Sequence, residues 1–333
     1  MRDRSTAVSR RLIQAVNAFP KVRVLVVGDL VADHYLYGQT ERVSREAPVL
    51  IVRHEREEVK LGGAANAAAN ARSLGGKVTA VGALGADEMA ARMKKHFKAA
   101  DIWLMATVDS ALATETKTRI LAGGQGTTRQ QMLRIDRGSQ GAIPERTRKL
   151  LAQAVRLAVK GTDVVVISDY GAGVVCDETR EVLRAWALKG GIICADSRYG
   201  LGSLVGATVC KPNEPELAAL TGMKVGSDHE LCAAAKRAFE LLDCRALLVT
   251  RGMRGMAVFE RGKPPVFIPV HGIADAVDVT GAGDTVVASL ALGLGAGASL
   301  ADAARLANIA GALVVQKPGT ATLTRAELLR ELE

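Results

Sequence analysis

Short apolar runs alternate with longer helical patterns along most of the chain. The runs occupy 22–29, 78–85, 162–170, 191–198, 207–213 and 246–252, and each ends in a polar residue or glycine. Helical spacing of apolar residues predicts helices at 62–75, about 143–160, 177–189, 214–222 and 228–242. Strands that are apolar on both faces and alternate with helices are typical of a mostly parallel sheet. The predicted fold class is therefore α/β and doubly wound, with helices on both faces of the sheet.

Two stretches depart from this pattern. Residues 32–60 and 107–136 alternate between apolar and polar positions with a period of two, which predicts antiparallel hairpins. One hairpin is expected to turn at 123–126, where the sequence reads Gly-Gly-Gln-Gly. We expect a single domain over 1–333, with a small β-sheet formed from these two stretches projecting from the strand ends as a lid.

Composition and charge narrow the class of protein. The chain has 333 residues, is 48% hydrophobic and carries a net charge of +9, so it can bury a substantial core. The basic residues are scattered and do not interleave with aromatic residues, which favours an anionic small molecule over nucleic acid as the partner. The apolar stretch 286–300 is rich in Gly and Ala and reads as a core helix, so no membrane partner is expected. Five scattered cysteines and the lack of a secretory leader predict a cytoplasmic protein.

Polar residues follow the predicted strands. In a doubly wound sheet, ligands bind at the carboxyl ends of the strands. The residues found there are Asp29, Asp33, Asp169, Asp196, Asn213, Thr250 and Arg251. Asp and Asn also end strands because they suit turns and helix N-caps, so each position alone has a structural alternative.

The segment "DVTGAGDTVVASL" (278–290) reads as a glycine turn followed by a helix that begins near Gly283. Glycines let backbone N–H groups approach a ligand, and a helix N-terminus favours an anion such as phosphate. A carboxylate at Asp284 is poorly placed to bind a phosphate but well placed to accept a proton from an attacking hydroxyl. The alternative is that Asp284 is a first-turn Asp favoured by the helix dipole.

A second segment, "LGGAANAAANARSLG" (61–75), opens a helix with small residues after Gly62-Gly63. Asn66 there offers a donor and an acceptor to ligand hydroxyls. Close packing of the helix on the sheet is the alternative. The chain lacks a Walker A sequence and a strand followed by GxGxxG. The five histidines show no catalytic spacing, and only His34, next to Asp33, is left open.

Four motifs, in order, are "GDLVADHYLYG", "GGAANAAANARSLG", "KPNEPEL" and "DVTGAGDT". Their order and spacing resemble the ribokinase-like (PfkB) carbohydrate kinases. Within that family, "YGQTERVSREAPVLIV", "TETKTRI", "MLRIDR" and "VVVISDYGAG" look like the D-glycero-D-manno-heptose 7-phosphate kinases, the kinase half of enzymes that supply ADP-heptose for lipopolysaccharide. Nothing after Thr324 resembles a nucleotidyltransferase, so a free-standing kinase is expected.

The resemblance implies a role for each matched position. It implies that Asp284 is the base and that the N–H groups of Gly281, Ala282 and Gly283 form the anion hole. For ATP it implies Asn213, Glu216, Thr250, Gly252, Gly255 and Asn308, with Glu216 positioning Mg²⁺ indirectly. For the sugar it implies Asp33, Gly62, Gly63, Asn66 and Asp169. A monovalent cation such as K⁺ would lie near Asp278, Thr280 and the "KPGTAT" loop.

A heptose 7-phosphate would also need a site for its own phosphate, which calls for converging cations. Lys117, Arg119, Arg134 and Arg198 are the candidates, and solvated charges on the lid are the alternative. Two segments depart from the heptose-kinase pattern. Ser44-Arg45-Glu46-Ala47-Pro48 stands for Ser-Pro-Glu-Ala-Pro, and Asp196-Ser197-Arg198 stands for Asp-Pro-Lys.

The sequence therefore predicts an ATP-dependent kinase that phosphorylates O1 of D-glycero-D-manno-heptose 7-phosphate to the 1,7-bisphosphate. The alternatives are a ribokinase-like kinase of another sugar, such as fructose or ribose, or of a nucleoside, and a non-catalytic binding protein of the same fold. Related kinases often dimerise through the lid sheet, so a homodimer is expected.

Overall fold

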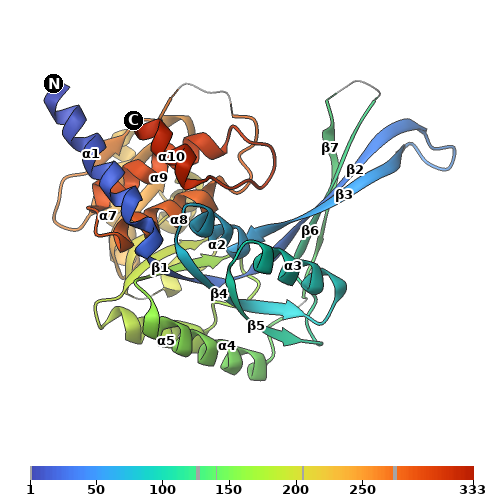
Figure 1. The fold of residues 1–333 in the computed structure, drawn as a ribbon, viewed down its shortest axis with the longest axis horizontal. Coiled ribbons are helices and arrows are strands. Elements are labelled where there is room, and N and C mark those ends of the chain that lie inside the picture. Colours follow the sequence, from blue (N-terminus) through green and yellow to red (C-terminus); the bar gives the residue numbers. More distant parts are fainter. Residues whose placement is uncertain (1, 125–127, 140, 205, 273–275) are drawn as a thin grey trace.

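A large twisted sheet with helices on both faces forms the body of the protein, and a smaller sheet projects from it (Figure 1). The computed structural model describes residues 2–124, 128–139, 141–204, 206–272 and 276–333. Within these residues the large sheet has nine strands in the order β13-β12-β11-β10-β9-β8-β1-β4-β5. Seven of them are parallel, and β12 and β13 run antiparallel at one edge. The strands are β1 (Arg23–Gly28), β4 (Lys77–Gly85), β5 (Trp103–Asp109), β8 (Val164–Asp169), β9 (Ile192–Ser197), β10 (Ala207–Cys210), β11 (Cys244–Thr250), β12 (Met256–Glu260) and β13 (Val266–Ile268).

The central strands are apolar on both sides because each side lies under its own layer of helices. In β1, Val24 and Val26 belong to one core cluster, and Leu25 and Val27 belong to the other. The first cluster packs under α1 (Arg2–Ala18), α2 (Ala64–Ser73), α3 (Glu88–Ala99), α8 (Ala282–Gly295), α9 (Leu300–Val314) and α10 (Arg325–Leu332). The second packs under α4 (Glu145–Ala158), α5 (Asp177–Ala187), α6 (Glu214–Thr221) and α7 (Asp228–Leu241). The predicted α/β class and the predicted helices are confirmed. No helix in the described ranges is both long and apolar enough to span a bilayer.

The small sheet consists of β2 (Leu30–Val43), β3 (Leu50–Gly63), β6 (Thr116–Gly123) and β7 (Gln130–Arg137), in the order β3-β2-β6-β7. The two predicted hairpins are present, and β2 and β6 join them in parallel. Residues 107–109 do not belong to this sheet, because they end β5 at the edge of the large sheet. Residues 125 and 126 of the predicted turn lie outside the described ranges. The single-domain assignment for 1–333 stays a prediction.

The large sheet and the small sheet meet at the carboxyl end of β1, and this junction is where the predicted functional residues lie. Only Asp29 separates β1 from β2, so the small sheet begins where the central parallel strand ends. The carboxyl ends of β8, β9, β10 and β11 follow along the same edge of the large sheet. Helix α8 packs against β8 and β9. Side chains from distant parts of the sequence therefore converge there.

Candidate active site

The turn before α8 has the conformation that its glycines allow. Gly281 has φ +78°, and a Cβ there would lie 2.5 Å from Asn66 Nδ2, so no larger residue fits without displacing that amide. Within the described residues, the N–H groups of Gly281 and Gly283 have no protein acceptor. The N–H of Ala282 donates instead to the carbonyl oxygen of Val279, at 3.2 Å. Two of the three predicted anion-hole donors are thus unpaired at a helix N-terminus.

Asp284, the predicted base, is 2% exposed and lies between two donors from other elements. Asn66 Nδ2, on α2, donates to its Oδ2 at 2.8 Å. The hydroxyl of Tyr170, which follows β8, donates to its Oδ1 at 2.9 Å. These two bonds fix the rotation of the carboxylate, while each oxygen keeps a second lone pair for a ligand hydroxyl.

Burial raises the pKa of Asp284 to about 7. The negative charge of Asp196 raises it further, and the hydrogen bonds from Asn66 and Tyr170 and the charge of Lys211 oppose the rise. Lys211 Nζ lies 2.9 Å from Asp196 Oδ2 and is buried beside the turn, 3.4 Å from where a Cβ of Gly283 would be. A carboxyl group with a pKa near neutrality is suited to general-base chemistry.

This pKa predicts how stability depends on pH. The carboxyl has a pKa of about 7 in the folded protein and near 4 in the unfolded protein. The contribution of the protonated group to the free energy of unfolding is therefore complete below about pH 4 and is lost as the pH rises through 7. We therefore expect Asp284→Asn to be more stable than the wild type at pH 8, by about 2 kcal/mol, and to lose this advantage towards pH 4. Urea unfolding of both proteins at pH 4.5 and pH 8 measures it. A difference that is the same at both pH values would contradict the raised pKa.

A pocket of about 360 Å³ adjoins the glycine turn, since Ala282 and Gly283 line it. Thr250, Gly252, Gly255 and Asn308 also line it, with mostly apolar neighbours. Four of the six predicted nucleotide residues therefore share one pocket of the size and character of a small-ligand site. The Asn308 side chain donates to the carbonyl oxygen of Pro269 at 2.8 Å, so in this structure it holds the pocket wall.

The other two predicted nucleotide residues, Asn213 and Glu216, form a capping box at the start of α6. Asn213 Oδ1 accepts from the Glu216 N–H at 2.7 Å, and Glu216 Oε2 accepts from the Asn213 N–H at 2.9 Å. Asn213 also bridges Thr250, which lines the pocket. Among the residues that the structure describes, no group of three metal-ligating side chains exists. One carboxylate beside a nucleotide pocket fits Mg²⁺, which usually binds through few carboxylates, waters and substrate phosphates.

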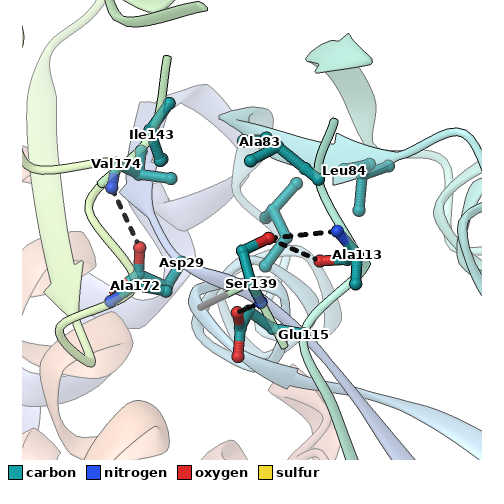
Figure 2. A pocket seen from close by; sticks show the side chains of 11 residues that line it. Asp29, Ala83, Leu84, Ala113, Glu115, Ser139, Ile143, Ala172 and Val174 are labelled. Atoms are coloured by element: carbon teal, nitrogen blue, oxygen red, sulfur yellow. Dashed lines mark hydrogen bonds between the residues drawn. The ribbon is translucent and has the colours of Figure 1, made fainter. Parts of the chain in front are cut away.

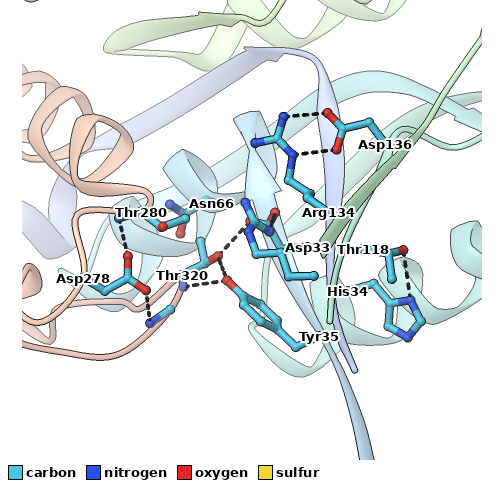
Figure 3. A network of polar contacts seen from close by, with 12 residues as sticks. Asp33, His34, Tyr35, Asn66, Thr118, Arg134, Asp136, Asp278, Thr280 and Thr320 are labelled. Carbon is cyan, nitrogen blue, oxygen red and sulfur yellow. Dashed lines mark hydrogen bonds and ion pairs between the residues drawn. The ribbon is translucent and has the colours of Figure 1, made fainter. Parts of the chain in front are cut away.

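Four of the five predicted sugar residues, Asp33, Gly62, Gly63 and Asn66, lie where β2 and β3 meet α2, and Figure 3 shows Asp33 and Asn66 near the glycine turn. Asp33 is buried, and its oxygens accept from Arg119 Nη1 and, at 2.8 Å, from Thr320 Oγ1. It lies directly over Gly62, whose Cβ would be 2.4 Å from Asp33 Oδ2. Gly63, with φ +56°, then turns the chain into α2 and so places Asn66. The predicted residues are brought together, although Asp33 and Asn66 are bonded to protein partners here.

His34, the histidine left open, lies on the other face of β2 from Asp33. Its Nε2 lies 2.9 Å from Glu57 Oε2, and Thr118 contacts Nδ1 at 3.4 Å (Figure 3). Neighbouring residues of a strand point to opposite faces, which separates His34 from the turn and from Asp284.

The four candidate cations of the second phosphate site divide into two kinds. Arg119 pairs with Asp33, and Arg134 pairs with Asp136 at 2.8 Å (Figure 3). Lys117 and Arg198 have no carboxylate within ion-pair distance in the described ranges.

Lys117 and Arg198 instead lie against the ring of Tyr170. Lys117 Nζ is 4.9 Å and Arg198 Cζ is 4.7 Å from the ring centroid. Burial lowers the pKa of Lys117, and the nearby charge of Arg198 lowers it further. The charges of Asp33 and Asp136 act on Lys117 in the opposite direction. Two cations without a directly contacting carboxylate thus converge near the residue that hydrogen-bonds Asp284.

Asp169 and Asp278 accept hydrogen bonds from nearby loop residues in this structure. Asp169 accepts from Ser197 Oγ at 2.7 Å and from the N–H of Gly171 at 3.0 Å. Asp278 accepts from the N–H groups of Thr280 and Gly319, at 2.8 and 2.9 Å, and so ties the glycine turn to the loop after α9. These bonds make both carboxylates organisers of the loops that surround Asp284. Their predicted contacts with the sugar and the monovalent cation stay predictions.

The two departures from the heptose-kinase pattern lie in different places. Ser44 and Arg45 are in the exposed connection between β2 and β3, far along the small sheet (Figure 1). Ser197 is buried and bonds Asp169, which directs the following Arg198 out towards Tyr170. The second departure is therefore at the site, and the first is not.

Sequence reasoning missed three residues of the site: Tyr170, Lys211 and Asn70. Asn70 Nδ2 donates to Asn66 Oδ1 at 3.0 Å and so orients the amide that bonds Asp284. Tyr170 and Lys211 each follow a buried strand directly, as the recognised polar residues do. That position was the available signal for both.

Comparisons with known proteins agree with this geometry. Residues 21–326 match the family model described as pfkB family carbohydrate kinase. The "Bifunctional protein HldE" of Geobacter sulfurreducens is 38% identical over 314 residues, and that of Caulobacter vibrioides is 40% identical over 315 residues. Each alignment covers 93% of this chain and 63% of the relative, so the chain spans less than two thirds of these relatives.

Solved structures share the fold at low sequence identity. Arabidopsis thaliana ribokinase, solved with ribose and ATP, superposes with a TM-score of 0.72 at 21% identity, covering 94% of this chain and 98% of its own. Escherichia coli phosphofructokinase-2, solved with substrates and products, gives a TM-score of 0.76 at 17% identity, covering 93% and 98%. These likenesses confirm the ribokinase-like fold.

Proposed function

Because this chain belongs to the pfkB family of carbohydrate kinases, we propose that its sugar substrate is itself phosphorylated, and specifically that it is D-glycero-D-manno-heptose 7-phosphate. The chain is an ATP-dependent carbohydrate kinase. The proposed reaction transfers the terminal phosphate of ATP to O1 of the heptose and gives the 1,7-bisphosphate. The motif resemblance to heptose 7-phosphate kinases supports this choice of sugar.

One observation carries the proposal for a phosphorylated sugar. Lys117 and Arg198 approach the same ring and have no carboxylate within ion-pair distance among the described residues. Burial and then the charge of Arg198 lower the pKa of Lys117, while the charges of Asp33 and Asp136 oppose this. Two cations held close together, with no carboxylate in direct contact with either, favour an anion between them. The ring that they share belongs to Tyr170, whose hydroxyl bonds Asp284. A sugar with its reacting hydroxyl at Asp284 and its phosphate at these cations uses both features.

The proposed chemistry assigns the proton to Asp284. As the sugar oxygen forms its bond to the terminal phosphorus and the bond from that phosphorus to the ADP oxygen breaks, Asp284 takes the hydroxyl proton. The N–H groups of Gly281 and Gly283 and the ammonium of Lys211 hold the negative charge of the transferred group. Mg²⁺, when bound, neutralises the nucleotide phosphates, and Glu216 with Asn213 is placed to position it. A monovalent cation at Asp278 and Thr280, and a cytoplasmic location, remain predictions.

A substrate panel tests the proposal. ADP release is followed with both anomers of heptose 7-phosphate, with fructose 6-phosphate and ribose 5-phosphate, and with unphosphorylated fructose, ribose and adenosine. We expect kcat/KM to be highest for one heptose 7-phosphate anomer and at least about a hundredfold lower for sugars that lack a phosphate. Preference for an unphosphorylated sugar or nucleoside would refute the phosphate site. ATP and sugar binding without turnover would favour a non-catalytic binding protein.

We also propose that the protein is a homodimer through the small sheet. Leu133 and Ile135 alternate on one face of β7 and are 54% and 47% exposed, and Leu50 on β3 is 47% exposed. These exposed apolar residues lie on both edge strands of the projecting sheet, and exposed apolar surface of this kind supports an interaction there. We expect light scattering to give twice the 35.0 kDa chain mass, and the double variant Leu133→Lys, Ile135→Lys to give the chain mass. A wild type that is monomeric at micromolar concentration would contradict the proposal.

A further inference from the structure

Tyr170 stands at the start of a loop that a buried carboxylate holds in place. Asp29 is 1% exposed and accepts from the N–H groups of Tyr170, Ala172 and Val174, at 2.7, 3.0 and 3.2 Å. Figure 2 shows Asp29 with Val174 and Ala172 at the edge of a small cavity, across from Glu115 and Ser139. Since three N–H groups at alternate residues are anchored to one buried carboxylate, the backbone that carries the Tyr170 side chain is held by the core.

The two parts of the Tyr170 side chain make different contacts. Its hydroxyl donates to Asp284 Oδ1 at 2.9 Å. Its ring has Lys117 Nζ at 4.9 Å and Arg198 Cζ at 4.7 Å from the centroid. Asp284, Lys117 and Arg198 come from α8, from β6 and from the segment after β9, so Tyr170 is where these three elements meet.

We propose that Tyr170 is a positioning residue that links recognition of the substrate phosphate to the base: its hydroxyl orients the Asp284 carboxylate, and its ring orients Lys117 and Arg198. The inference rests on the proposed function, because it takes Asp284 as the base and the two cations as the phosphate site. Under this proposal the Tyr170 hydroxyl affects kcat through Asp284, and the Tyr170 ring affects KM through Lys117 and Arg198.

The hydroxyl acts on the base through geometry and charge. With Asn66 at Oδ2 and Tyr170 at Oδ1, the carboxylate has one orientation. The charged groups that face Asp284 are Asp196 and Lys211, which push its pKa in opposite directions. Loss of the Tyr170 hydroxyl removes a donor that favours the ionised form, so a larger share of the enzyme would carry a protonated base at neutral pH.

The ring acts on the cations. A lysine or arginine over an aromatic face is attracted by the ring quadrupole, and the attraction strengthens where water is partly excluded. Lys117 and Arg198 repel one another even with the ring present. Without the ring they would also lose the attraction that holds them in the orientation in which they converge on one phosphate.

Two variants separate these effects. Tyr170→Phe keeps the ring and removes the hydroxyl, and Tyr170→Leu removes both. For Tyr170→Phe we expect KM for the sugar phosphate to stay within about twofold of the wild type. We expect the acidic limb of its kcat–pH profile to move up by about one pH unit from the Asp284 pKa of about 7, so that kcat falls about fivefold at pH 7 and largely recovers at pH 9. For Tyr170→Leu we expect, in addition, a rise in KM of about tenfold.

The result that overturns the inference is a Tyr170→Phe profile with the wild-type pH dependence, or a loss that is equal at every pH and accompanied by a raised KM. A titration that needs no substrate gives a second readout. In protein labelled with ¹³C at the aspartate carboxyl, the Asp284 signal is assigned by its absence in Asp284→Asn. It should titrate at higher pH in Tyr170→Phe than in the wild type, and an unchanged titration would refute the role of the hydroxyl. If the wild type phosphorylated no sugar phosphate, the proposed function would fail, and this titration alone would decide the role of the hydroxyl.

Discussion

The Asp284→Asn enzyme is expected to turn over at least about a thousandfold more slowly than the wild type at pH 8, with nucleotide affinity unchanged. An amide of the same shape can keep its contacts with Asn66 and Tyr170, but it cannot accept a proton from the sugar hydroxyl. The nucleotide pocket takes its walls from residues around Thr250 and Asn308, which this change leaves intact. Steady-state kinetics measure the turnover, and calorimetry with a non-hydrolysable ATP analogue measures nucleotide binding.

Two further results make this experiment selective. Retained nucleotide affinity shows that the variant is folded around its pocket, so a loss of turnover then belongs to the chemical step. A variant with near wild-type turnover would remove Asp284 from the mechanism. The same protein also tests the expected gain in stability at pH 8, because relief of a buried carboxylate and loss of a base are two effects of one substitution.

The second large effect is expected on substrate affinity. The double variant Lys117→Ala, Arg198→Ala should raise KM for the sugar phosphate at least about a hundredfold, because each partly desolvated cation makes a charge-assisted bond to the phosphate. The KM for ATP should not change, since neither residue lines the nucleotide pocket. Initial-rate kinetics with each substrate varied in turn separate the two constants.

A matched control is available on the same sheet. Arg129→Ala also removes a positive charge, but Arg129 pairs with Glu55 on the exposed part of the sheet, so KM for the sugar phosphate should stay at the wild-type value. A KM that rises equally in the control would point to the overall charge of the sheet. If the double variant kept the wild-type KM, the substrate phosphate would have to be bound elsewhere or be absent.

The core of the fold could be predicted from the sequence because its strands are buried on both faces. In β1, consecutive residues face two different cores, and that produces an unbroken apolar run. The small sheet could also be predicted, since its residues alternate between apolar and polar along the sequence. The start of its second hairpin could not be predicted correctly. Residues 107–109 belong to β5 of the large sheet, and an alternating pattern alone does not say which sheet a residue joins.

The glycine turn and Asp284 could be predicted because their chemistry is local to one segment. The division among the candidate cations could not. Lys117 and Arg119 share one face of β6, as alternation requires. The register of β2 with β6 places Asp33 opposite Lys117, yet the ion pair of Asp33 is with Arg119, two residues further along. Register is a property of two strands that lie far apart in the sequence. For the same reason Tyr170 escaped notice: its partners come from three elements that the sheet order, and not the sequence, brings together.

Phosphorus NMR of the reaction product is the most direct test of the central claim, which is phosphoryl transfer to O1 of a sugar that already carries a phosphate. After reaction of heptose 7-phosphate with ATP, we predict two sugar phosphorus signals of equal intensity, one of them coupled to the anomeric proton. The Asp284→Asn enzyme should give only the original 7-phosphate signal under the same conditions. A new phosphate ester at any other carbon, or no second sugar phosphate with the wild-type enzyme, would contradict the account.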